Sequence, residues 1–548
     1  MAWQTLTKKK TRSAVAGATQ FDVVVVGAGF AGLYALYRLR QLGLSVRLFE
    51  EGGGVGGTWY WNRYPGARCD TESLQYSYQF SEELQQEWDW SERYATQPEI
   101  ERYLSHVADR FGLRSDIELD ARVERVHYDE VTERWGVAIS DGTEIDARFC
   151  VMATGCLSSP MTPKIDGLDS FTGPKYHTAR WPDTTVDFAG LDVGVLGTGS
   201  SAMQVVTILA EEAKHLYVFQ RTPNYAVPAW NGPLDPDYVR QFKAHYAENR
   251  RKAKQLVSGF LCYYNPKSAL DVSQEERDRE YEDRWRQGGI GYLGAFADIT
   301  TNETANRTAA DYVHRKIRSI VEDPEVAELL IPNSVIGCKR LCCHAGYYAT
   351  FNGDHVTLVD AKTNPIERVV PEGVVIAGQT FRIDALVLAT GFDAMTGALD
   401  KIDIRGKAGT RLKDKWANGP RAYLGVASAG FPNFFIVTGP GSPSVLTNMV
   451  PTIEQHVDFI ADCIAHMRAS NIRSVDPDVA AENAWVAYND EVAHGTLRYD
   501  CASWYLGSNV PGKKPIFMPF VGGLPAYIRK CDEVVAAGYE GFNFTPAS

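Results

Sequence analysis

The stretch Phe21-Asp-Val-Val-Val-Val-Gly27-Ala-Gly29-Phe-Ala-Gly32 predicts a buried parallel strand that runs directly into a glycine-rich turn. An apolar-periodic helix is expected from Gly32 to about Gly43, and Ser45-Val-Arg-Leu-Phe49 is the next predicted strand. This order of elements is that of a βαβ unit that binds dinucleotides. The turn lets the backbone approach a pyrophosphate, and Glu50 stands where an acid bonds a ribose hydroxyl.

A second unit of the same kind begins at Leu191. It consists of the strand Leu191-Asp-Val-Gly-Val-Leu196, the turn Gly197-Thr198-Gly199-Ser200-Ser201-Ala202, a helix to Lys214 and the strand His215-Leu-Tyr-Val-Phe219. The two copies match in register, because Gly27 to Glu50 and Gly197 to Gln220 both span 23 residues. The chain therefore carries two predicted dinucleotide sites.

The two units differ at the position of the acid. The second unit has neutral Gln220 there, followed by Arg221 and Thr222. A carboxylate would repel a 2′-phosphate, whereas Arg221 would hold it by charge-assisted hydrogen bonds, with Lys339 as a candidate second cation. We expect FAD or NAD at the first unit and NADP at the second. The alternative for Arg221 is a solvated charge at the end of a strand.

A glycine loop soon after Glu50 favours FAD at the first unit. It contains Gly56-Gly57-Thr58-Trp59, and such a loop passes the flavin ring in many flavoproteins. Trp59 and Trp61 are also compatible with an ordinary role as core aromatics.

The remaining sequence indicates discontinuous domains. Two predicted strands end in Ala-Thr-Gly, at 153–155 and 389–391, and would return the chain from one nucleotide domain to the other. Charged helical segments such as 273–287 and 306–322 indicate a helical insertion. The predicted fold class is α/β, with two Rossmann-like dinucleotide-binding domains, for FAD and NADP, and a helical insertion in the NADP domain. The expected parts are a flexible tail at 1–20, an FAD domain at 21–156 and 393–548, an NADP domain at 157–226 and 333–392, and the insertion at 227–332.

Composition excludes several classes of protein. A net charge of −12, without a basic face carrying interleaved aromatics, argues against nucleic acid as a partner. No apolar run of about 18 residues exists, so we expect no membrane span. The ten cysteines contain no C-x-x-C pair, and we expect reduced thiols in a cytoplasmic protein. The cluster Cys338, Cys342, Cys343 and His344 lacks a second ligand pair, so we expect incidental thiols and no metal.

Two longer patterns point to one family. Phe171-Thr-Gly173-Pro-Lys-Tyr-His177-Thr-Ala-Arg-Trp181-Pro182 has the form F-x-G-x-x-x-H-x-x-x-W-P. The second runs from Gly56 through Trp59 and Tyr64-Pro-Gly66 to Asp70. With Cys338-Lys-Arg340, Gly439-Pro-Gly-Ser-Pro-Ser444 and Ala502-Ser-Trp504-Tyr, the chain resembles the type I Baeyer–Villiger monooxygenases over almost its entire length after the tail. These flavoenzymes insert oxygen beside a ketone carbonyl.

The resemblance implies a role for particular residues. Arg340 would be the catalytic arginine beside the flavin and Asp70 the carboxylate that holds it, although Asp70 could instead cap a tight turn. His177 would lie in the interdomain linker as a conformational residue that does not touch substrate. The loop 442–449, here with Ser444, Val445 and Leu446, would line the substrate pocket. The predicted cofactor-binding residues are Gly27, Gly29, Gly32, Glu50, Gly57, Thr58, Trp59, Arg68, Asp70, Tyr76, Val123 and Met449 for FAD, and Thr198, Gly199, Ser200, Ser201, Gln204, Arg221, Thr222, Lys339, Arg340 and Trp504 for NADPH and the reaction centre.

The implied reaction uses NADPH and O2 to convert a ketone to an ester or lactone, through a C4a-peroxyflavin and a tetrahedral (Criegee) adduct. The alternative is a flavin monooxygenase that oxidises nitrogen or sulfur, against which the Trp181-Pro182 ending argues. A disulfide reductase would need a redox cysteine pair just after the first unit, where only Cys69 occurs. A silent flavoprotein sensor would not need Asp70, Lys339 and Arg340 together. We expect a monomer.

Overall fold

The computed structural model describes residues 19–547. The expected tail at 1–20 therefore lies almost wholly outside the described residues, and the first strand, β1 (Gln20–Val26), already begins at Gln20. The expected first unit is present as β1, helix α1 (Phe30–Gln41) and β2 (Val46–Phe49).

The first sheet is organised around β1, whose two faces are both covered. Val23 and Val25 belong to the core beneath the helices, whereas Val24 and Val26 belong to a core with Trp135 on the opposite face. This explains the continuous valine run, because a strand covered on both sides has no polar face. The order in space is β17 (Asp403–Arg405), β4 (Val123–Asp129), β5 (Arg134–Ile139), β6 (Glu144–Met152), β1, β2 and β3 (Ile117–Glu118), with β18 (Phe434–Ile436) paired to the end of β6.

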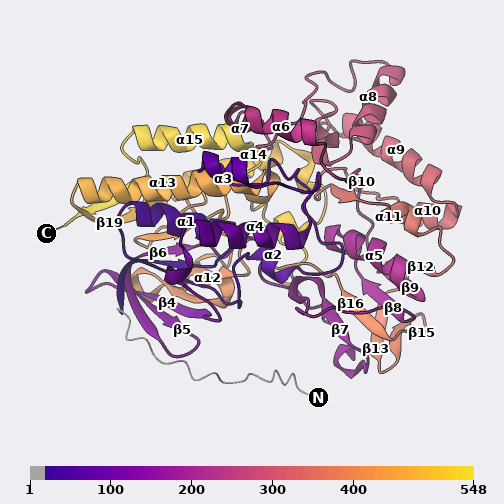
Figure 1. The fold of residues 1–548 in the computed structure, drawn as a ribbon, viewed down its shortest axis with the longest axis horizontal. Coiled ribbons are helices and arrows are strands. Elements are labelled where there is room, and N and C mark those ends of the chain that lie inside the picture. The colour runs from indigo at the N-terminus through magenta and orange to yellow at the C-terminus, as the bar shows by residue number, and fades with distance from the viewer. Residues whose placement is uncertain (1–18, 548) are drawn as a thin grey trace.

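The second sheet is wholly parallel and carries the second unit. Helix α5 (Ser200–Glu212) follows its central strand β8, and the sheet lies on the opposite side of the molecule from the first (Figure 1). Its order is β12 (Val356–Asp360), β9 (His215–Gln220), β8 (Asp192–Leu196), β16 (Ala385–Leu388) and β7 (Lys175–His177). An antiparallel meander lies beside it, formed by β13 (Ile366–Val370), β14 (Gly373–Ile376) and β15 (Gln379–Arg382). The predicted α/β class is confirmed.

Residues 229–332 are helical, as the charged helical patterns predict. Helices α6 (Pro236–Ala244), α7 (Tyr246–Lys254), α8 (Gln274–Gln287), α9 (Glu303–Ile320) and α10 (Pro324–Leu330) occupy this part of the chain. A two-stranded ribbon, β10 (Ala226–Pro228) and β11 (Cys342–His344), joins its two ends. The chain thus leaves and re-enters the second unit at adjacent strands.

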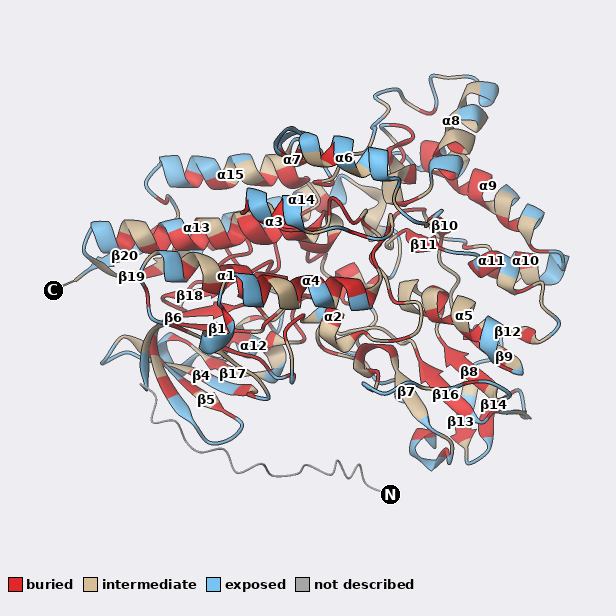
Figure 2. Cartoon of the chain, viewed as in Figure 1, coloured by how far each residue is buried: buried red, intermediate tan, exposed pale blue. Residues whose placement is uncertain are grey.

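The C-terminal part of the chain returns to the first sheet. Helix α13 (Met449–Ala469) is buried along most of its length and packs on α1 (Figure 2), where Arg38 Nε donates to Asp458 at 2.7 Å. The other α-helices of residues 19–547 are α2 (Thr58–Trp61), α3 (Glu82–Glu87), α4 (Gln97–Arg110), α11 (Tyr347–Thr350), α12 (Leu412–Lys415), α14 (Val479–His494) and α15 (Leu524–Ala536). Strand β19 (Ile472–Pro477) pairs with β20 (Phe542–Pro546).

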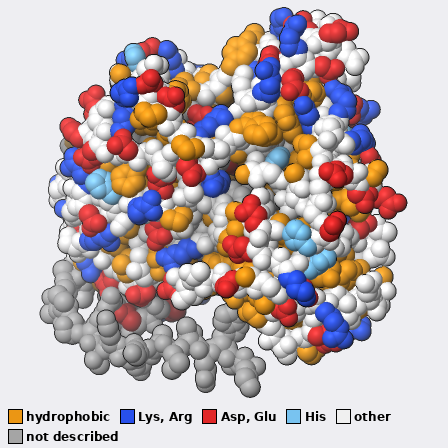
Figure 3. Space-filling view, turned by 45° about the vertical axis from the view of Figure 1, so that its right-hand side comes forward, with side chains coloured by type: hydrophobic (Ala, Val, Ile, Leu, Met, Phe, Trp, Pro, Cys, Tyr) orange, Lys and Arg blue, Asp and Glu red, His pale blue; other side chains and the backbone are white. Residues whose placement is uncertain are grey.

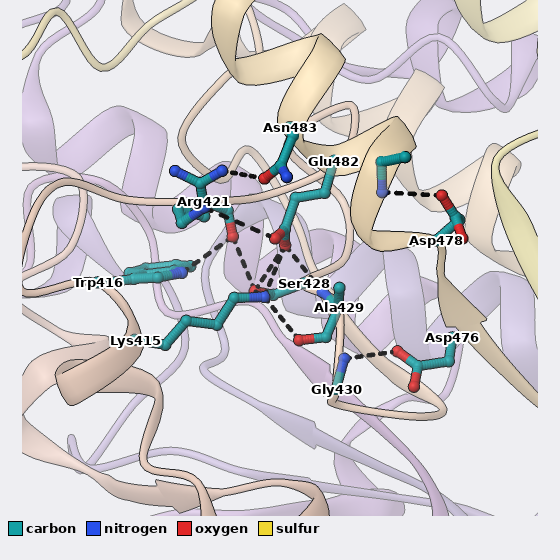
Figure 4. A network of polar contacts seen from close by, with 11 residues as sticks. Lys415, Trp416, Arg421, Ser428, Ala429, Gly430, Asp476, Asp478, Glu482 and Asn483 are labelled. Atoms are coloured by element: carbon teal, nitrogen blue, oxygen red, sulfur yellow. Dashed lines mark hydrogen bonds and ion pairs between the residues drawn. The ribbon is translucent and has the colours of Figure 1, made fainter.

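A buried ionic network fixes α14 in this part (Figure 4). The Glu482 carboxylate accepts from Lys415 Nζ at 2.8 Å, from Ser428 Oγ at 3.1 Å and from the Ala429 N–H at 2.8 Å. Burial lowers the pKa of Lys415, and the Glu482 carboxylate opposes that shift. The same helix reaches the site loop, because Trp485 Nε1 donates to the Gly441 carbonyl at 3.1 Å.

Candidate functional site

The first glycine turn is packed so tightly that only glycine fits at two positions. A Cβ on Gly32 would lie 1.8 Å from the Gly27 carbonyl oxygen, and one on Gly27, whose φ is +104°, would lie 2.5 Å from the Ala153 oxygen. Glu50 braces the turn, since its carboxylate accepts from the Ala28 N–H at 2.7 Å and from the Gly52 N–H at 2.8 Å. Burial raises the pKa of Glu50, whereas these two hydrogen bonds act to lower it.

The second glycine loop lies directly against the first. A Cβ on Gly57 would be 2.8 Å from the Gly29 Cα, and Thr58 then begins α2. Trp59 is buried in the main core, and its indole N–H donates to the Tyr76 hydroxyl at 3.2 Å. These two aromatic side chains therefore anchor the glycine loop to the core of the first unit.

The segment after α2 joins the first unit to the second. Tyr64 donates to Gln204 Oε1 at 2.7 Å, and Gln204 Nε2 donates to the Arg68 carbonyl at 3.1 Å. A Cβ on Gly66 would lie 2.7 Å from the Gln204 carbonyl oxygen. The amide of Gln204, predicted to contact a cofactor, is thus engaged in holding the two units together. Arg68 itself pairs with Glu92 at 2.9 Å.

The turn of the second unit leaves open space where a pyrophosphate would lie. A Cβ on Gly199 would meet no atom within 4 Å, although one on Gly197 would be 2.5 Å from the Ala389 oxygen. The N-cap of α5 is Gly199, which has no side chain to cap the helix, and within residues 19–547 no side chain accepts from the N–H groups of Ser200 and Ser201, which start the helix. Thr198 Oγ1 fixes the turn by donating to the Thr222 carbonyl at 2.8 Å.

Two cations follow this turn. Arg221 is exposed just beyond β9, whereas the side chain of Gln220 turns inward and donates to the Leu329 carbonyl at 2.7 Å. Lys339 is half-buried, and burial and then the nearby Arg221 charge lower its pKa. Two like charges held close together are suited to a doubly charged phosphate.

Arg340, the next residue, is held rigidly. Its guanidinium donates to both oxygens of Asp70 at 2.7 Å, and Nη1 donates to the Val445 carbonyl at 2.7 Å. Burial alone would lower the pKa of Arg340, but the Asp70 carboxylate raises it above its ordinary value. The group is therefore a permanent cation. Both Asp70 oxygens face Arg340, an arrangement that favours ion pairing over the capping of a turn.

Comparison with known proteins places this arrangement in a family. The model for pyridine nucleotide-disulphide oxidoreductases matches residues 24–259. A Baeyer-Villiger monooxygenase of Pseudooceanicola batsensis is 43% identical over 523 residues, 95% of this chain and 95% of that protein. The chain belongs to the Baeyer–Villiger monooxygenase family. The predicted resemblance is confirmed.

Three further proteins with different names are similar to this Baeyer–Villiger family member over almost its whole length. An oxidized steroid monooxygenase bound to NADP is 52% identical, with a TM-score of 0.93 over 96% of this chain and 100% of that chain. A complex of OTEMO with FAD and NADP is 39% identical, with a TM-score of 0.93 over 96% of this chain and 99% of that chain. A phenazine N-monooxygenase of Lysobacter antibioticus is 40% identical over 530 residues, 96% of this chain and 97% of that protein.

The fingerprint segment of this Baeyer–Villiger family member joins the second sheet. His177 ends β7, and its Nε2 lies 3.3 Å from both the Met161 carbonyl and Thr390 Oγ1. Burial lowers the pKa of His177, which keeps the ring neutral. A Cβ on Gly173 would lie 2.2 Å from the Asp384 carbonyl oxygen and 2.7 Å from the Phe171 ring, so only glycine fits at position 173. Trp181 is buried, 5.2 Å from the Tyr176 ring centroid.

The predicted substrate loop is a structural support for Arg340. Ser444 has a φ of +43° and is fully buried, with its Oγ 3.0 Å from Cys156 Sγ. Val445 supplies the carbonyl that accepts from Arg340, and Leu446 is only partly buried. Of the three side chains, that of Leu446 is the least buried.

The remaining predicted cofactor residues, Val123, Met449 and Trp504, lie in three different elements. Val123 begins β4 of the first sheet and is buried in the core that contains Trp135, whereas Met449 begins α13 and packs against two cores. Trp504 is partly buried and lies 4.1 Å from the Tyr505 ring, centroid to centroid. Tyr505 was not among the residues predicted from the sequence, although its hydroxyl interacts with Arg340.

The expectation of reduced thiols throughout is wrong for one pair. Cys338 forms a disulfide with Cys501, 163 residues away in the sequence. The other eight cysteines, all within residues 19–547, are free thiols. Cys342 and Cys343 lie buried in β11, and burial raises the pKa of both, so neither is a reactive thiolate. Only folding brings Cys338 and Cys501 together, so the spacing of cysteines could not reveal the bond.

Alanine substitutions at Gly32 and Gly199 are expected to give different defects, the first in folding and flavin content and the second in the KM for NADPH. Gly32→Ala forces a methyl into the Gly27 carbonyl and should cost about 1–3 kcal/mol or more, with loss of bound flavin. Gly199→Ala meets no protein atom, so stability should change by less than about 0.5 kcal/mol. Its KM for NADPH should rise about tenfold, a loss of about 1.4 kcal/mol. Thermal unfolding, flavin content and initial rates separate the two outcomes, and an unchanged KM would contradict the proposed pyrophosphate position.

A pH effect on NADPH use is expected from Lys339. Because its pKa is lowered, Lys339 loses its proton at a lower pH than an ordinary lysine. The kcat/KM for NADPH should therefore fall as pH rises, and the fall should begin below the pH at which an ordinary lysine, with a pKa of about 10.4, loses its proton. Lys339→Arg keeps its charge as the pH rises and should flatten the profile. If both proteins give the same profile, Lys339 does not contact the phosphate.

Proposed function

We propose that this chain is an FAD- and NADPH-dependent monooxygenase that inserts one oxygen atom of O2 beside a ketone carbonyl and gives an ester or lactone. The observation that carries the proposal is the geometry of Arg340. This permanent cation is held by Asp70 and the Val445 carbonyl, and it directly follows Lys339, the candidate cation for the NADPH phosphate. The relatives named as Baeyer-Villiger and steroid monooxygenases support this reaction class.

The residues present fit both cofactors. Gly27, Gly29 and Gly57 form a backbone cradle in which any side chain would clash or narrow the space. Glu50, whose oxygens accept from the Ala28 and Gly52 N–H groups, is the carboxylate that we assign to a ribose hydroxyl. The open space at Gly199 and the cations Arg221 and Lys339 fit NADPH. We assign the predicted FAD domain, at 21–156 and 393–548, to the first cradle. The predicted NADP domain, at 157–226 and 333–392, is assigned to the second, with 227–332 as its insertion.

The chain itself supplies charge and placement, while bound FAD, reduced by NADPH, activates O2 and provides the inserted oxygen. Addition of an oxygen nucleophile to a ketone carbonyl places negative charge on the former carbonyl oxygen. Arg340 stabilises that charge, because a guanidinium remains protonated beside a basic anion. Asp70 orients the guanidinium plane by a two-point contact, and the Val445 carbonyl fixes the remaining nitrogen. The side chains of Arg340 and Asp70 are 26% and 19% exposed, so bound cofactor and substrate would complete the exclusion of water from these groups.

Oxidation of nitrogen is the second candidate, because a phenazine N-monooxygenase is among the relatives. Such a reaction generates no carbonyl oxyanion, so it gives a fixed arginine less to stabilise. The orientation of Arg340 by three hydrogen bonds therefore favours the ketone.

Product analysis under ¹⁸O2 tests the proposal. The holoenzyme is supplied with NADPH, aryl-alkyl, linear and cyclic ketones, one thioether and one aromatic amine. One labelled oxygen in an ester or lactone supports the proposal. A labelled sulfoxide or N-oxide, without any ester, would assign the enzyme to heteroatom oxidation.

We also propose a monomeric, cytoplasmic enzyme. Acidic and basic side chains are mixed over the face seen in Figure 3, in keeping with small-molecule partners and with no nucleic acid. Among residues 19–547, no helix has the length and apolar character needed to cross a bilayer. Light scattering measures the mass in solution, and cell fractionation measures the location.

A further inference from the structure

The Cys338–Cys501 disulfide connects two segments that both belong to the proposed site. Cys338 directly precedes Lys339 and Arg340 and is 1% exposed. Cys501 lies in residues 497–506, which we call the clamp segment, three residues before Trp504. The bond therefore joins the loop of the two functional cations to the segment that carries Trp504 and Tyr505.

Other contacts of the clamp segment converge on the same loop. Arg498 Nη1 donates to the Gly337 carbonyl at 2.8 Å, and its guanidinium lies 5.8 Å from the Tyr505 ring centroid. Within residues 19–547, no carboxylate forms an ion pair with Arg498, and its buried Nε has no hydrogen-bond partner. Tyr505 is 2% exposed, and the Arg340 charge acts on its hydroxyl. Two positive groups, Arg340 and Arg498, are thus held near each other around one phenol.

The electrostatics of this arrangement oppose the contact between the segments. Arg498 and Arg340 repel each other, and burial lowers the pKa of Arg498. The noncovalent connections to this loop are the hydrogen bond from Arg498 to the Gly337 carbonyl and the interaction of the Tyr505 hydroxyl with Arg340, and Tyr505 also packs in the core that contains Val445. The covalent bond offsets this repulsion. Its loss removes a constraint between the two segments, so we expect the loop of Lys339 and Arg340 to shift relative to the clamp segment, whose Tyr505 stays packed in its core and accepts from the Met518 N–H.

We propose that the Cys338–Cys501 disulfide is a redox-dependent positioning clamp, which holds Tyr505 and Trp504 against Lys339 and Arg340 and so sets the efficiency of oxygen transfer. This inference rests on the proposed function of Arg340. The disulfide contacts neither substrate nor cofactor and acts through the placement of these side chains. Because cytosolic thiol systems reduce most disulfides, the clamp couples turnover to the redox state around the enzyme.

The redox step is ordinary thiol–disulfide exchange. A dithiol such as dithiothreitol attacks one sulfur, the Sγ–Sγ bond breaks, and the second thiol of the reagent closes to a cyclic disulfide. The reagent gives two electrons and two protons, and Cys338 and Cys501 become thiols. An oxidised dithiol reverses the step.

The first measurement counts thiols in the denatured holoenzyme. Eight reactive thiols are expected before reduction and ten after it, because two of the ten cysteines are bonded. Ten thiols in protein purified under oxidising conditions would overturn the proposal.

The second measurement compares oxidised and reduced holoenzyme, and the variants Cys501→Ser and Cys338→Ser/Cys501→Ser. Reduction or substitution should lower ester formed per NADPH roughly tenfold, with more H2O2 released and a higher KM for NADPH, because small misplacements at a reacting centre are costly. FAD content and the far-UV circular dichroism should stay unchanged. Equal coupling and equal KM in all forms would overturn the clamp.

Two controls keep the outcome specific. Dithiothreitol should have no effect on the double variant, and Cys262→Ser, which removes a partly exposed free thiol, should behave as the wild type in both redox states. If the oxidised wild type forms no ester at all, the proposed function fails. If it forms ester with the same coupling in both redox states, only the clamp fails.

Discussion

Arg340→Ala is expected to lower ester formation by on the order of 10²–10³-fold, the usual cost of removing a preorganised group that stabilises an oxyanion. FAD content and reduction of the flavin by NADPH should remain, because Arg340 lies outside both glycine turns. The oxidised NADPH should then appear as H2O2 and not as ester. Gas chromatography of the product, a peroxide assay and stopped-flow measurement of flavin reduction give the three quantities separately.

Arg340→Lys is the matched variant for this result. Lysine keeps a positive charge but cannot bond both Asp70 oxygens and the Val445 carbonyl in the fixed planar geometry of arginine. We expect a rate between those of the wild type and the alanine variant. Ester formation by Arg340→Ala at a near-normal rate would remove Arg340 from the reaction and leave it a structural role only.

Glu482→Ala is expected to give the largest loss of stability. Glu482 is 1% exposed and accepts hydrogen bonds from Lys415, Ser428 and Ala429. Its removal leaves the partly buried Lys415 ammonium, 16% exposed, without its carboxylate. Because such a change costs about 3–5 kcal/mol in a fully buried pair, we expect about 3 kcal/mol here. The urea midpoint of the holoenzyme, followed by circular dichroism, should fall accordingly. Activity should fall with it, since α14 supports Gly441 through Trp485.

Two comparisons isolate the cause of this loss. Asp478→Ala removes the partly exposed N-cap of the same helix and should cost only about 1 kcal/mol. Lys415→Met/Glu482→Leu removes both charges, so it should be less destabilising than Glu482→Ala alone. If Asp478→Ala and Glu482→Ala destabilise equally, the network contributes little beyond helix capping.

The two βαβ units could be predicted from sequence with their order and register. The strand from Phe21, the turn at Gly27 and the helix that follows lie within one short stretch, and each has a local signal in valine content, glycine or apolar period. The predicted boundaries differ from the observed ones by one or two residues, as for β1 and α5. The helical character of residues 229–332 was also predictable, because charged amphipathic patterns are local.

The candidate site was predicted as a list of residues, whereas its contacts were not. The sequence suggested Arg340 with Asp70 by resemblance, but the Val445 carbonyl, Tyr505 and Arg498 carry no motif. Gln204 and Ser444 were predicted to face a cofactor or substrate, and the structure shows their polar groups bonded within the protein.

Sequence alone determined which elements form and which nucleotide chemistry each glycine turn suits, because those signals act between neighbours along the chain. The tertiary structure alone decided what surrounds Arg340. Its partners Asp70 and Val445 are 270 and 105 residues away, and the disulfide beside it spans 163 residues. Such contacts depend on how whole sheets and helices pack, and a side chain gives no local sign of a partner that it meets only in the folded protein.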